Sequence, residues 1–128
     1  MERNRKPRVL VVDDHEDNIE LLRARLEARG YEVYGANDGQ AALEQVQRVC
    51  PDLILLDMMM PGRSGIEVLE DLRADPELQE VPVVMLTARA QAADREAAER
   101  AGADRFLSKP FSPAELSRLV EELLGRGR

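Results

Sequence analysis

Residues 51–65 read PDLILLDMMMPGRSG. Within this stretch, residues 53–56 form an unbroken apolar run, and Asp57 follows it directly. Two further runs have the same character, residues 9–12 and residues 83–86. Short, continuous runs rich in Val, Ile and Leu are typical of strands that are covered on both faces of a parallel sheet. These segments therefore predict three central strands.

Two weaker strands, Glu32–Ala36 and Arg105–Ser108, complete the predicted sheet. Each of them follows a glycine, Gly30 or Gly102, at a place where the end of a helix requires a positive φ angle. The two glycines therefore indicate that a helix precedes each of these strands.

Apolar residues at helical spacing fill the intervals between the strands. The stripes are Ile19, Leu22 and Leu26, then Ala42, Val46 and Val49, then Ile66, Leu69 and Leu72. The last helix is expected over residues 113–124, with Ser112 as its N-cap and Glu115 completing a capping box. The fourth helix, roughly residues 91–100, offers little more than alanine to its buried face. We expect it to be weakly packed and the most mobile helix.

Strand and helix thus alternate five times along the chain. Parallel strands joined by right-handed crossovers form an open sheet with helices on both faces. The pattern predicts an α/β fold, a doubly wound five-stranded parallel sheet. We expect this domain to occupy residues 8–124, after a disordered tail at 1–7. Residues 125–128 read as a second tail, either a chain end or the start of a linker.

The composition limits the classes of function. The chain has 128 residues, enough for one domain, and its 44% hydrophobic and 34% charged residues fit a soluble globular protein. A net charge of -7 opposes direct nucleic-acid binding. Cys50 is the single cysteine, so no internal disulfide can form, and no apolar run reaches the roughly 18 residues of a membrane span. We expect a cytoplasmic protein that does not enter a membrane.

Polar residues lie directly after the predicted strands. They are Asp13, Asp14, Asp57, Thr87 and Lys109. Ligands of doubly wound sheets bind outside the carboxyl ends of the strands, where these residues should converge. A purely structural edge needs only turn formers, so this convergence indicates a site for chemistry.

Three carboxylates in one place require a cation. Two unit charges ~5 Å apart repel by about 3 kcal/mol at an effective dielectric constant of ~20. Lys109 offsets part of this repulsion, and a set of oxygen ligands also suits Mg²⁺. With a metal present, an aspartate can attack phosphorus to form an acyl phosphate, while lysine and hydroxyl groups stabilise the transferring group.

The chain resembles bacterial response-regulator receiver domains from Arg8 to about Leu124. The matching segments are VLVVDD, PDLILLDMMMPGRSG, VPVVMLTA and GADRFLSKPF, in this order. Together they are specific, although each alone is weak. The resemblance, which is closest to stand-alone chemotaxis regulators, implies the flavodoxin-like strand order 2-1-3-4-5.

The resemblance also implies roles for the acidic residues. Asp57 is similar to the phosphoryl acceptor of the family. Asp14, Asp57 and the backbone carbonyl of Met59 match the direct Mg²⁺ ligands, and Asp13 matches a residue that reaches the metal through water. Arg89, two residues after Thr87, and Met59 flank the path of attacking water, so the resemblance leaves the lifetime of the phosphorylated state open.

Further roles concern the phosphoryl group and the response to it. Thr87 would hydrogen-bond the phosphoryl oxygens, and Lys109 would form an ion pair with them. Phe106 occupies the position of the switch aromatic, whose ring turns inward as the Thr87 hydroxyl moves; it lacks the hydroxyl of a tyrosine. Pro110 stands where the family often has a cis peptide bond.

Structural roles compete with these functional ones. Asp13 and Asp14 could be a turn and N-cap pair, and Phe106 could be a core aromatic. The methionines 58–60 read as filling of core and loop gaps. His15 is read as an exposed residue, because a lone histidine is weak evidence for a metal ligand.

The main functional prediction is a phosphorylation-dependent signalling switch of a two-component phosphorelay. A sensor histidine kinase or a histidine phosphotransfer protein would phosphorylate Asp57. A downstream effector protein, or a second copy in a homodimer, would bind the face made by helix 91–100, strand 105–108 and the last helix. The chain would thus be a phosphoacceptor that assists its own phosphorylation and dephosphorylation, and not an enzyme.

Three alternatives differ in kind. A phosphatase of the haloacid-dehalogenase type would need a second carboxylate two residues after Asp57, where Met59 stands. A flavodoxin-like electron carrier would bind FMN phosphate after the first strand, where Asp13 and Asp14 would repel it. The chain could also be the receiver fragment of a longer regulator.

Overall fold

The computed structural model describes residues 5–60, 62–88 and 92–124. Five strands and five helices alternate: β1 (Arg8–Val12), α1 (Glu16–Glu27), β2 (Glu32–Ala36), α2 (Gly39–Val49), β3 (Leu53–Asp57), α3 (Gly65–Ala74), β4 (Val83–Thr87), α4 (Ala92–Ala101), β5 (Arg105–Ser108) and α5 (Pro113–Leu124). The strands are parallel and follow the order β2-β1-β3-β4-β5. The predicted fold class and strand order are confirmed.

β1 begins one residue earlier than the sequence predicts, and β3 and β4 each end one residue later. Asp57 is the last residue of β3 and pairs with Leu86, and Thr87 is the last residue of β4 and pairs with Ser108. Both side chains were expected just after the strands. The parallel pairing continues through both positions, so their backbones are held by the sheet itself.

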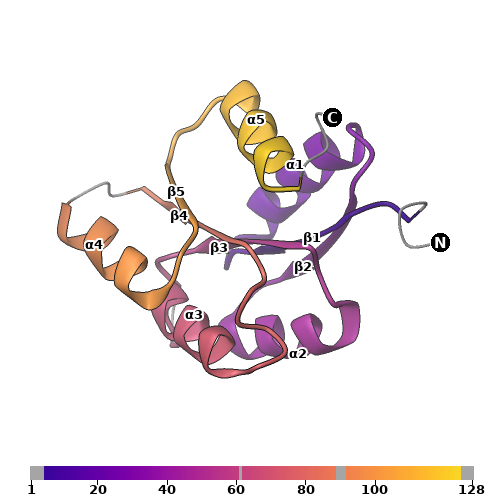
Figure 1. Ribbon diagram of the computed structural model, residues 1–128. Helices are drawn as coiled ribbons and strands as arrows, with labels where there is room; N and C mark the ends of the chain where they lie inside the picture. Colours follow the sequence, from indigo (N-terminus) through magenta and orange to yellow (C-terminus); the bar gives the residue numbers. More distant parts are fainter. Residues whose placement is uncertain (1–4, 61, 89–91, 125–128) are drawn as a thin grey trace.

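The helices cover both faces of the sheet (Figure 1). Helices α1 and α5 lie on one face, and α2, α3 and α4 lie on the other. Each face has its own apolar cluster, built around Leu22, Leu26 and Val120 on the first face and around Val46, Leu69 and Leu72 on the second. The sheet is therefore the middle layer of three, and its central strands are buried on both sides.

Local signals for the helices are mostly confirmed. Gly30 and Gly102 have φ angles of 95° and 108°, as expected for residues that end a helix. The Ser112 hydroxyl accepts from Glu115 N at 3.0 Å, and the Glu115 carboxylate accepts from Ser112 N at 2.9 Å, so the predicted capping box is present. In α3 the predicted stripe is confirmed, with Leu69 and Leu72 buried and Ile66 half-buried against the same cluster.

Helix α3 buries Val68 in addition to Leu69 and Leu72. Within the described residues, helix α4 buries only the Ala98 side chain fully, in line with its alanine-rich sequence. Its greater mobility stays a prediction. The predicted first residue of this helix, Gln91, lies outside the described residues.

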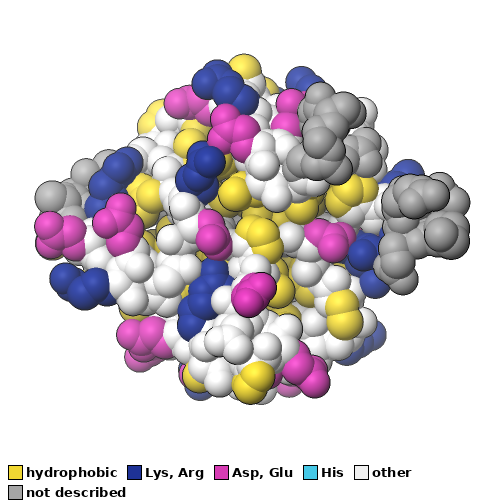
Figure 2. Space-filling model, in the orientation of Figure 1, with side chains coloured by type: hydrophobic (Ala, Val, Ile, Leu, Met, Phe, Trp, Pro, Cys, Tyr) yellow, Lys and Arg dark blue, Asp and Glu magenta, His cyan; other side chains and the backbone are white. Residues whose placement is uncertain are grey.

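Charge is mixed on the face of the molecule that Figure 2 shows. In Figure 2 the basic and acidic side chains alternate over the visible face, so the net charge of -7 does not form one large acidic field there.

No helix in the described parts of the chain combines the length and apolar character that crossing a bilayer requires. At the start of the domain, the Pro7 carbonyl accepts a hydrogen bond from Glu32 N at 2.9 Å.

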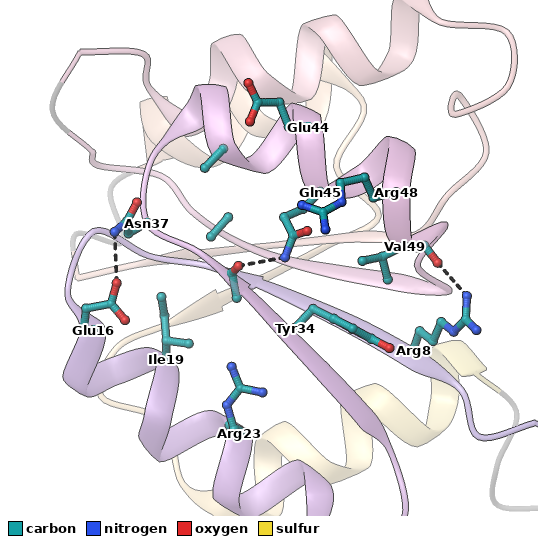
Figure 3. Close-up of a pocket in the computed structure, with 13 residues that line it drawn as sticks. Arg8, Glu16, Ile19, Arg23, Tyr34, Asn37, Glu44, Gln45, Arg48 and Val49 are labelled. Atoms are coloured by element: carbon teal, nitrogen blue, oxygen red, sulfur yellow. Dashed lines mark hydrogen bonds between the residues drawn. The ribbon is translucent and has the colours of Figure 1, made fainter.

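The open edge of the sheet at β2 is covered by side chains. Arg23 of α1 donates to the Val33 carbonyl at 2.7 Å, and Gln45 of α2 donates to the Gly35 carbonyl at 3.2 Å. Figure 3 shows the groove of about 710 Å³ along this edge, with Tyr34 in its centre. The two donors stand where the N–H groups of a sixth strand would stand, which protects the edge from pairing with another chain.

Removing both donors should therefore expose the edge. The double variant Arg23→Ala with Gln45→Ala is expected to lose about 1–2 kcal/mol of unfolding free energy and to self-associate as its concentration rises. Light scattering over a concentration series measures the association. Gln40→Ala is the matched control, because this exposed residue of α2 bonds to the Glu44 side chain and not to the β2 edge. A double variant that keeps the mass of the unchanged chain at every concentration contradicts the edge-protecting role.

Candidate functional site

The predicted polar residues meet at the carboxyl edge of the sheet. Asp13 and Asp14 follow β1, Asp57 ends β3, Thr87 ends β4, and Lys109 follows β5. Among the buried residues of the described chain, Asp13, Asp57 and Thr87 are the polar or charged ones, with exposed fractions of 1%, 5% and 1%. Burying two carboxylates and a hydroxyl at one edge is costly unless they are paired, which marks the place as functional.

Lys109 supplies the cation within the described residues of the site. Its Nζ lies 3.3 Å from Asp13 Oδ2 and 3.7 Å from Asp57 Oδ2. The Lys109 backbone N–H donates to the Thr87 carbonyl at 2.7 Å, which ties the end of β5 to the end of β4. The Lys109–Pro110 peptide bond is cis, as the family resemblance implied.

Asp13 is held by several donors. Its Oδ1 accepts from the His15 backbone N–H at 2.9 Å. Its Oδ2 accepts from the Asn18 amide at 3.2 Å and from Lys109 Nζ at 3.3 Å. The carboxylate is therefore fixed in orientation and is satisfied by hydrogen bonds from the protein.

Asp14 is different, because one of its oxygens lacks a donor. Its Oδ1 is buried and accepts no hydrogen bond from the described part of the chain. The His15 ring Nδ1 lies 3.2 Å from this atom without hydrogen-bond geometry, and the His15 side chain is 71% exposed, as predicted. A buried carboxylate oxygen without a partner is costly. Together with Asp13 and Asp57 it offers the hard oxygen ligands that Mg²⁺ prefers, so the residues present fit this ion.

Asp57 is destabilised in its charged form. Burial raises the pKa of its carboxyl above the usual value, and the charges of Asp13 and Asp14 act in the same direction. The Lys109 ammonium and the hydrogen bond from Met59 N, at 3.2 Å, oppose this increase in pKa without cancelling it. A cation bound beside Asp57 would thus stabilise both its charge and the fold.

The loop after β3 places the site closely against α3. Gly65, the first residue of α3, leaves no room for a side chain: a Cβ atom there would lie 2.3 Å from the Asp57 carbonyl oxygen and 2.9 Å from Met58 Cα. A capping box between Ser64 and Glu67 starts the helix at this point. Neither feature was predicted from the sequence. The glycine at a first helical position, where better helix formers are common, was the available signal.

The methionines of this loop have different surroundings. Met58 and Met60 are buried in the apolar cluster under α2 and α3, which confirms their reading as core filling. The Met59 side chain is 57% exposed, and its N–H is directed to Asp57. The role of the Met59 carbonyl as a metal ligand stays a prediction, and Arg89 lies outside the described residues.

Phe106 lies between the sheet and α4. It is half-buried against the apolar cluster of that face, next to the strand pair that ends at Thr87. The guanidinium carbon of Arg95, on α4, lies 4.8 Å from the centre of the Phe106 ring, a cation–π contact. The ring therefore links β5 to the helix that contributes the fewest buried side chains.

Comparison with known proteins agrees with this geometry. Residues 9–121 match the family described as response regulator receiver domain. The chain belongs to this family. Receiver domains are signalling switches rather than conventional enzymes, and they generally bind Mg²⁺ at an acidic pocket. They interact with histidine kinases and downstream effectors.

Several relatives of this receiver domain are longer proteins. The chain is 43% identical over 122 residues to the phosphate regulon transcriptional regulatory protein PhoB of Rhizobium meliloti, which covers 95% of the chain and 54% of PhoB. It is 46% identical over 116 residues to the response regulator PleD of Caulobacter vibrioides, covering 91% of the chain and 26% of PleD. The chain thus spans about half, or less, of these curated relatives.

A solved structure matches over its full length. The Vibrio cholerae chemotaxis protein CheY4 aligns with a TM-score of 0.89 at 31% identity, covering 94% of the chain and 100% of that structure. A putative response regulator from Chloroflexus aurantiacus aligns with a TM-score of 0.89 at 35% identity, covering 94% of the chain and 99% of that structure. The receiver fold therefore extends over nearly the whole chain.

Proposed function

We propose that the chain is a phosphorylation-dependent switch in which Asp57 accepts a phosphoryl group from a sensor histidine kinase or a histidine phosphotransfer protein. The observation that carries this proposal is the placement of the buried Asp57 carboxylate, with its raised pKa, 3.7 Å from Lys109 Nζ. An Asp57 oxygen forms the new bond to phosphorus while the bond from phosphorus to the donor breaks. The donor leaves with the electron pair of that bond.

The surrounding residues of the chain stabilise the transferring group. Lys109 Nζ faces the negative charge of the phosphoryl oxygens, and the Thr87 hydroxyl hydrogen-bonds one of them after transfer. Asp13, Asp14, Asp57 and the Met59 carbonyl would hold Mg²⁺, Asp13 through water. When bound, the ion supplies positive charge that neutralises the carboxylates and the incoming phosphate.

Access for a donor protein is supported by the surface next to the site. A groove of about 280 Å³ runs beside Asp13 and Lys109 to Leu21 of α1. Leu21 is one of the exposed large hydrophobic residues of the described chain, with 53% of its surface accessible. A donor that presents an apolar surface to Leu21 would bring its phosphohistidine to the acidic edge.

The output face is proposed to be α4, β5 and α5. Movement of the Thr87 hydroxyl toward the phosphoryl group would free space for Phe106 to turn inward, and the Arg95 contact on the ring would then break. Helix α4 is suited to respond, because Ala98 is its only fully buried side chain in the described residues. A downstream effector, or a second copy of the chain, would bind the altered face.

The cellular location and the domain organisation of the chain follow from the same proposal. A phosphorelay with a kinase points to the cytoplasm, to a receiver domain over residues 8–124, and to assistance by the chain in its own phosphorylation and dephosphorylation. The length of PhoB and PleD relative to their matched parts supports a receiver that is joined to an output module in some contexts. Direct nucleic-acid or membrane binding is not part of the proposed role.

The competing chemistries receive no support from the site. A haloacid-dehalogenase-type phosphatase needs a general acid two residues after Asp57, and Met59 has no proton to give. An FMN-binding electron carrier needs donors after β1, where Asp13 and Asp14 present carboxylates. Each chemistry requires a residue type at a position where this chain has a different one.

Intact mass spectrometry tests the proposal. Incubation with acetyl phosphate and Mg²⁺ should add one phosphoryl group to the unchanged chain. Asp57→Asn, or removal of the metal with a chelator, should abolish the gain. Asp52→Asn is the matched control, because Asp52 lies at the opposite end of β3 and should keep full phosphorylation. An unchanged mass of the wild type under every condition would sink the proposed chemistry and leave a binding module.

A further inference from the structure

The two side-chain donors on Asp13 share a single oxygen atom. Asn18 Nδ2 lies 3.2 Å and Lys109 Nζ lies 3.3 Å from Asp13 Oδ2. Asn18 belongs to α1 and Lys109 follows β5, so the carboxylate connects two elements at opposite ends of the sequence. The amide is a neutral donor and the ammonium a charged one, and both are directed at one acceptor.

The sharing of Asp13 Oδ2 affects where the Lys109 ammonium lies. Lys109 Nζ is 3.3 Å from Asp13 but 3.7 Å from Asp57, so it lies between the two carboxylates, slightly closer to Asp13. Asp13 is 1% exposed and has almost no access to water. If the Asn18 amide were absent, Asp13 Oδ2 would depend on Lys109 alone, and the ammonium would be drawn further from Asp57.

The Asn18 side chain has no partner in its own helix. The N-cap of α1 is His15, without a side-chain cap, and Asn18 is in the first turn, with its backbone N–H already bonded to the His15 carbonyl at 3.0 Å. The amide group instead reaches back to Asp13, which precedes the helix. Its contact is therefore with the site and not with the helix start.

We propose that Asn18 is a positioning residue: by donating to Asp13 Oδ2 it holds the Lys109 ammonium between Asp13 and Asp57 and so sets the rate at which Asp57 is phosphorylated. This inference rests on the proposed phosphoacceptor function. Asn18 does not touch Asp57 or the incoming phosphoryl group, and it acts only through Asp13 and Lys109.

The first test compares Asn18→Ala with Asn37→Ala. Asn37 is the matched control, since its amide bonds to the exposed Glu16 carboxylate and not to Asp13. With acetyl phosphate and saturating Mg²⁺, Asp57 of Asn18→Ala is expected to be phosphorylated about five- to tenfold more slowly than in the wild type. A rate change of this size corresponds to the free energy of one lost hydrogen bond. Asn37→Ala should keep the wild-type rate. An unchanged rate in Asn18→Ala overturns the inference, while a wild type that takes up no phosphate overturns the proposed function instead.

The second test does not depend on phosphorylation. The ¹³C signals of the Asp13 and Asp57 carboxyl groups are measured by NMR in metal-free protein at one fixed pH. Asn18→Ala should shift the Asp57 signal as well as the Asp13 signal, because the ammonium moves between them. In a Lys109→Met background, Asn18→Ala should shift Asp13 only. An unmoved Asp57 signal, or an equal shift of Asp57 in both backgrounds, overturns positioning through Lys109.

Discussion

Replacing Gly65 by alanine is expected to lower the unfolding free energy by about 1–3 kcal/mol and to slow the phosphorylation of Asp57. Helix propensity alone would favour the alanine by up to about 1 kcal/mol. The contact reverses this sign, because the new Cβ would lie 2.3 Å from the Asp57 carbonyl oxygen and 2.9 Å from Met58 Cα. Either α3 or the end of β3 must then move, and the acceptor carboxylate moves with the strand.

Gly62→Ala is the matched control for this prediction. Gly62 has a φ of +76°, but a Cβ atom there meets nothing within 4 Å. The control should cost about 1 kcal/mol through backbone strain alone and should leave the phosphorylation rate unchanged. Urea denaturation and the acetyl phosphate assay measure both variants. If Gly65→Ala is as stable as the wild type and as reactive, the close approach of α3 to Asp57 has no energetic role.

Asp57→Asn is expected to stabilise the metal-free protein at neutral pH by about 1–2 kcal/mol, although it abolishes phosphorylation. Burial, together with Asp13 and Asp14, raises the pKa of the Asp57 carboxyl in the folded state. The folded protein therefore pays for the charge of Asp57 at neutral pH. The asparagine side chain is of similar size and carries no charge, so it removes this cost.

The difference in unfolding free energy between Asp57→Asn and the wild type should change with pH in a definite direction. A carboxyl with a raised folded pKa contributes stability that is fully present below its unfolded pKa, about 4, and is lost as the pH rises through the folded pKa. Asp57→Asn should thus match the wild type near pH 3 and exceed it by a margin that grows as the pH rises from the unfolded pKa to the folded pKa. Urea denaturation across this range, without divalent cations, measures the gap.

An exposed carboxylate serves as the control for that series. Glu44→Gln, on the surface of α2, should show a small difference from the wild type at all pH values. Saturating Mg²⁺ should reduce or reverse the gap between wild type and Asp57→Asn, because the ion binds the folded wild type more strongly. A gap that stays constant from pH 3 to pH 7 would mean that the Asp57 charge does not oppose folding.

The strengths and failures of sequence-based prediction have identifiable causes. The three central strands were found because each is a short apolar run, and the two weaker strands because each follows a glycine that ends a helix. The predicted stripe of α3 was incomplete, since Val68 is also buried, while Ile66 is only half-buried against the core. Spacing of three or four residues fits several stripes of a short helix equally well, and only the neighbouring helices select one of them.

The sequence by itself determined the order of strands and helices and the meeting of Asp13, Asp57 and Lys109 at one edge, because polar residues that follow apolar strands must lie at the carboxyl ends of a parallel sheet. The tertiary structure alone decided how donors are distributed among the carboxylates. Asp13 Oδ2 accepts hydrogen bonds both from Asn18 and from Lys109, which is 96 positions away in the sequence. Asp14 Oδ1, in contrast, accepts no hydrogen bond from the described chain. Such differences depend on tenths of an ångström between distant segments, and those distances are set by the packing of helices on the sheet rather than by any local pattern.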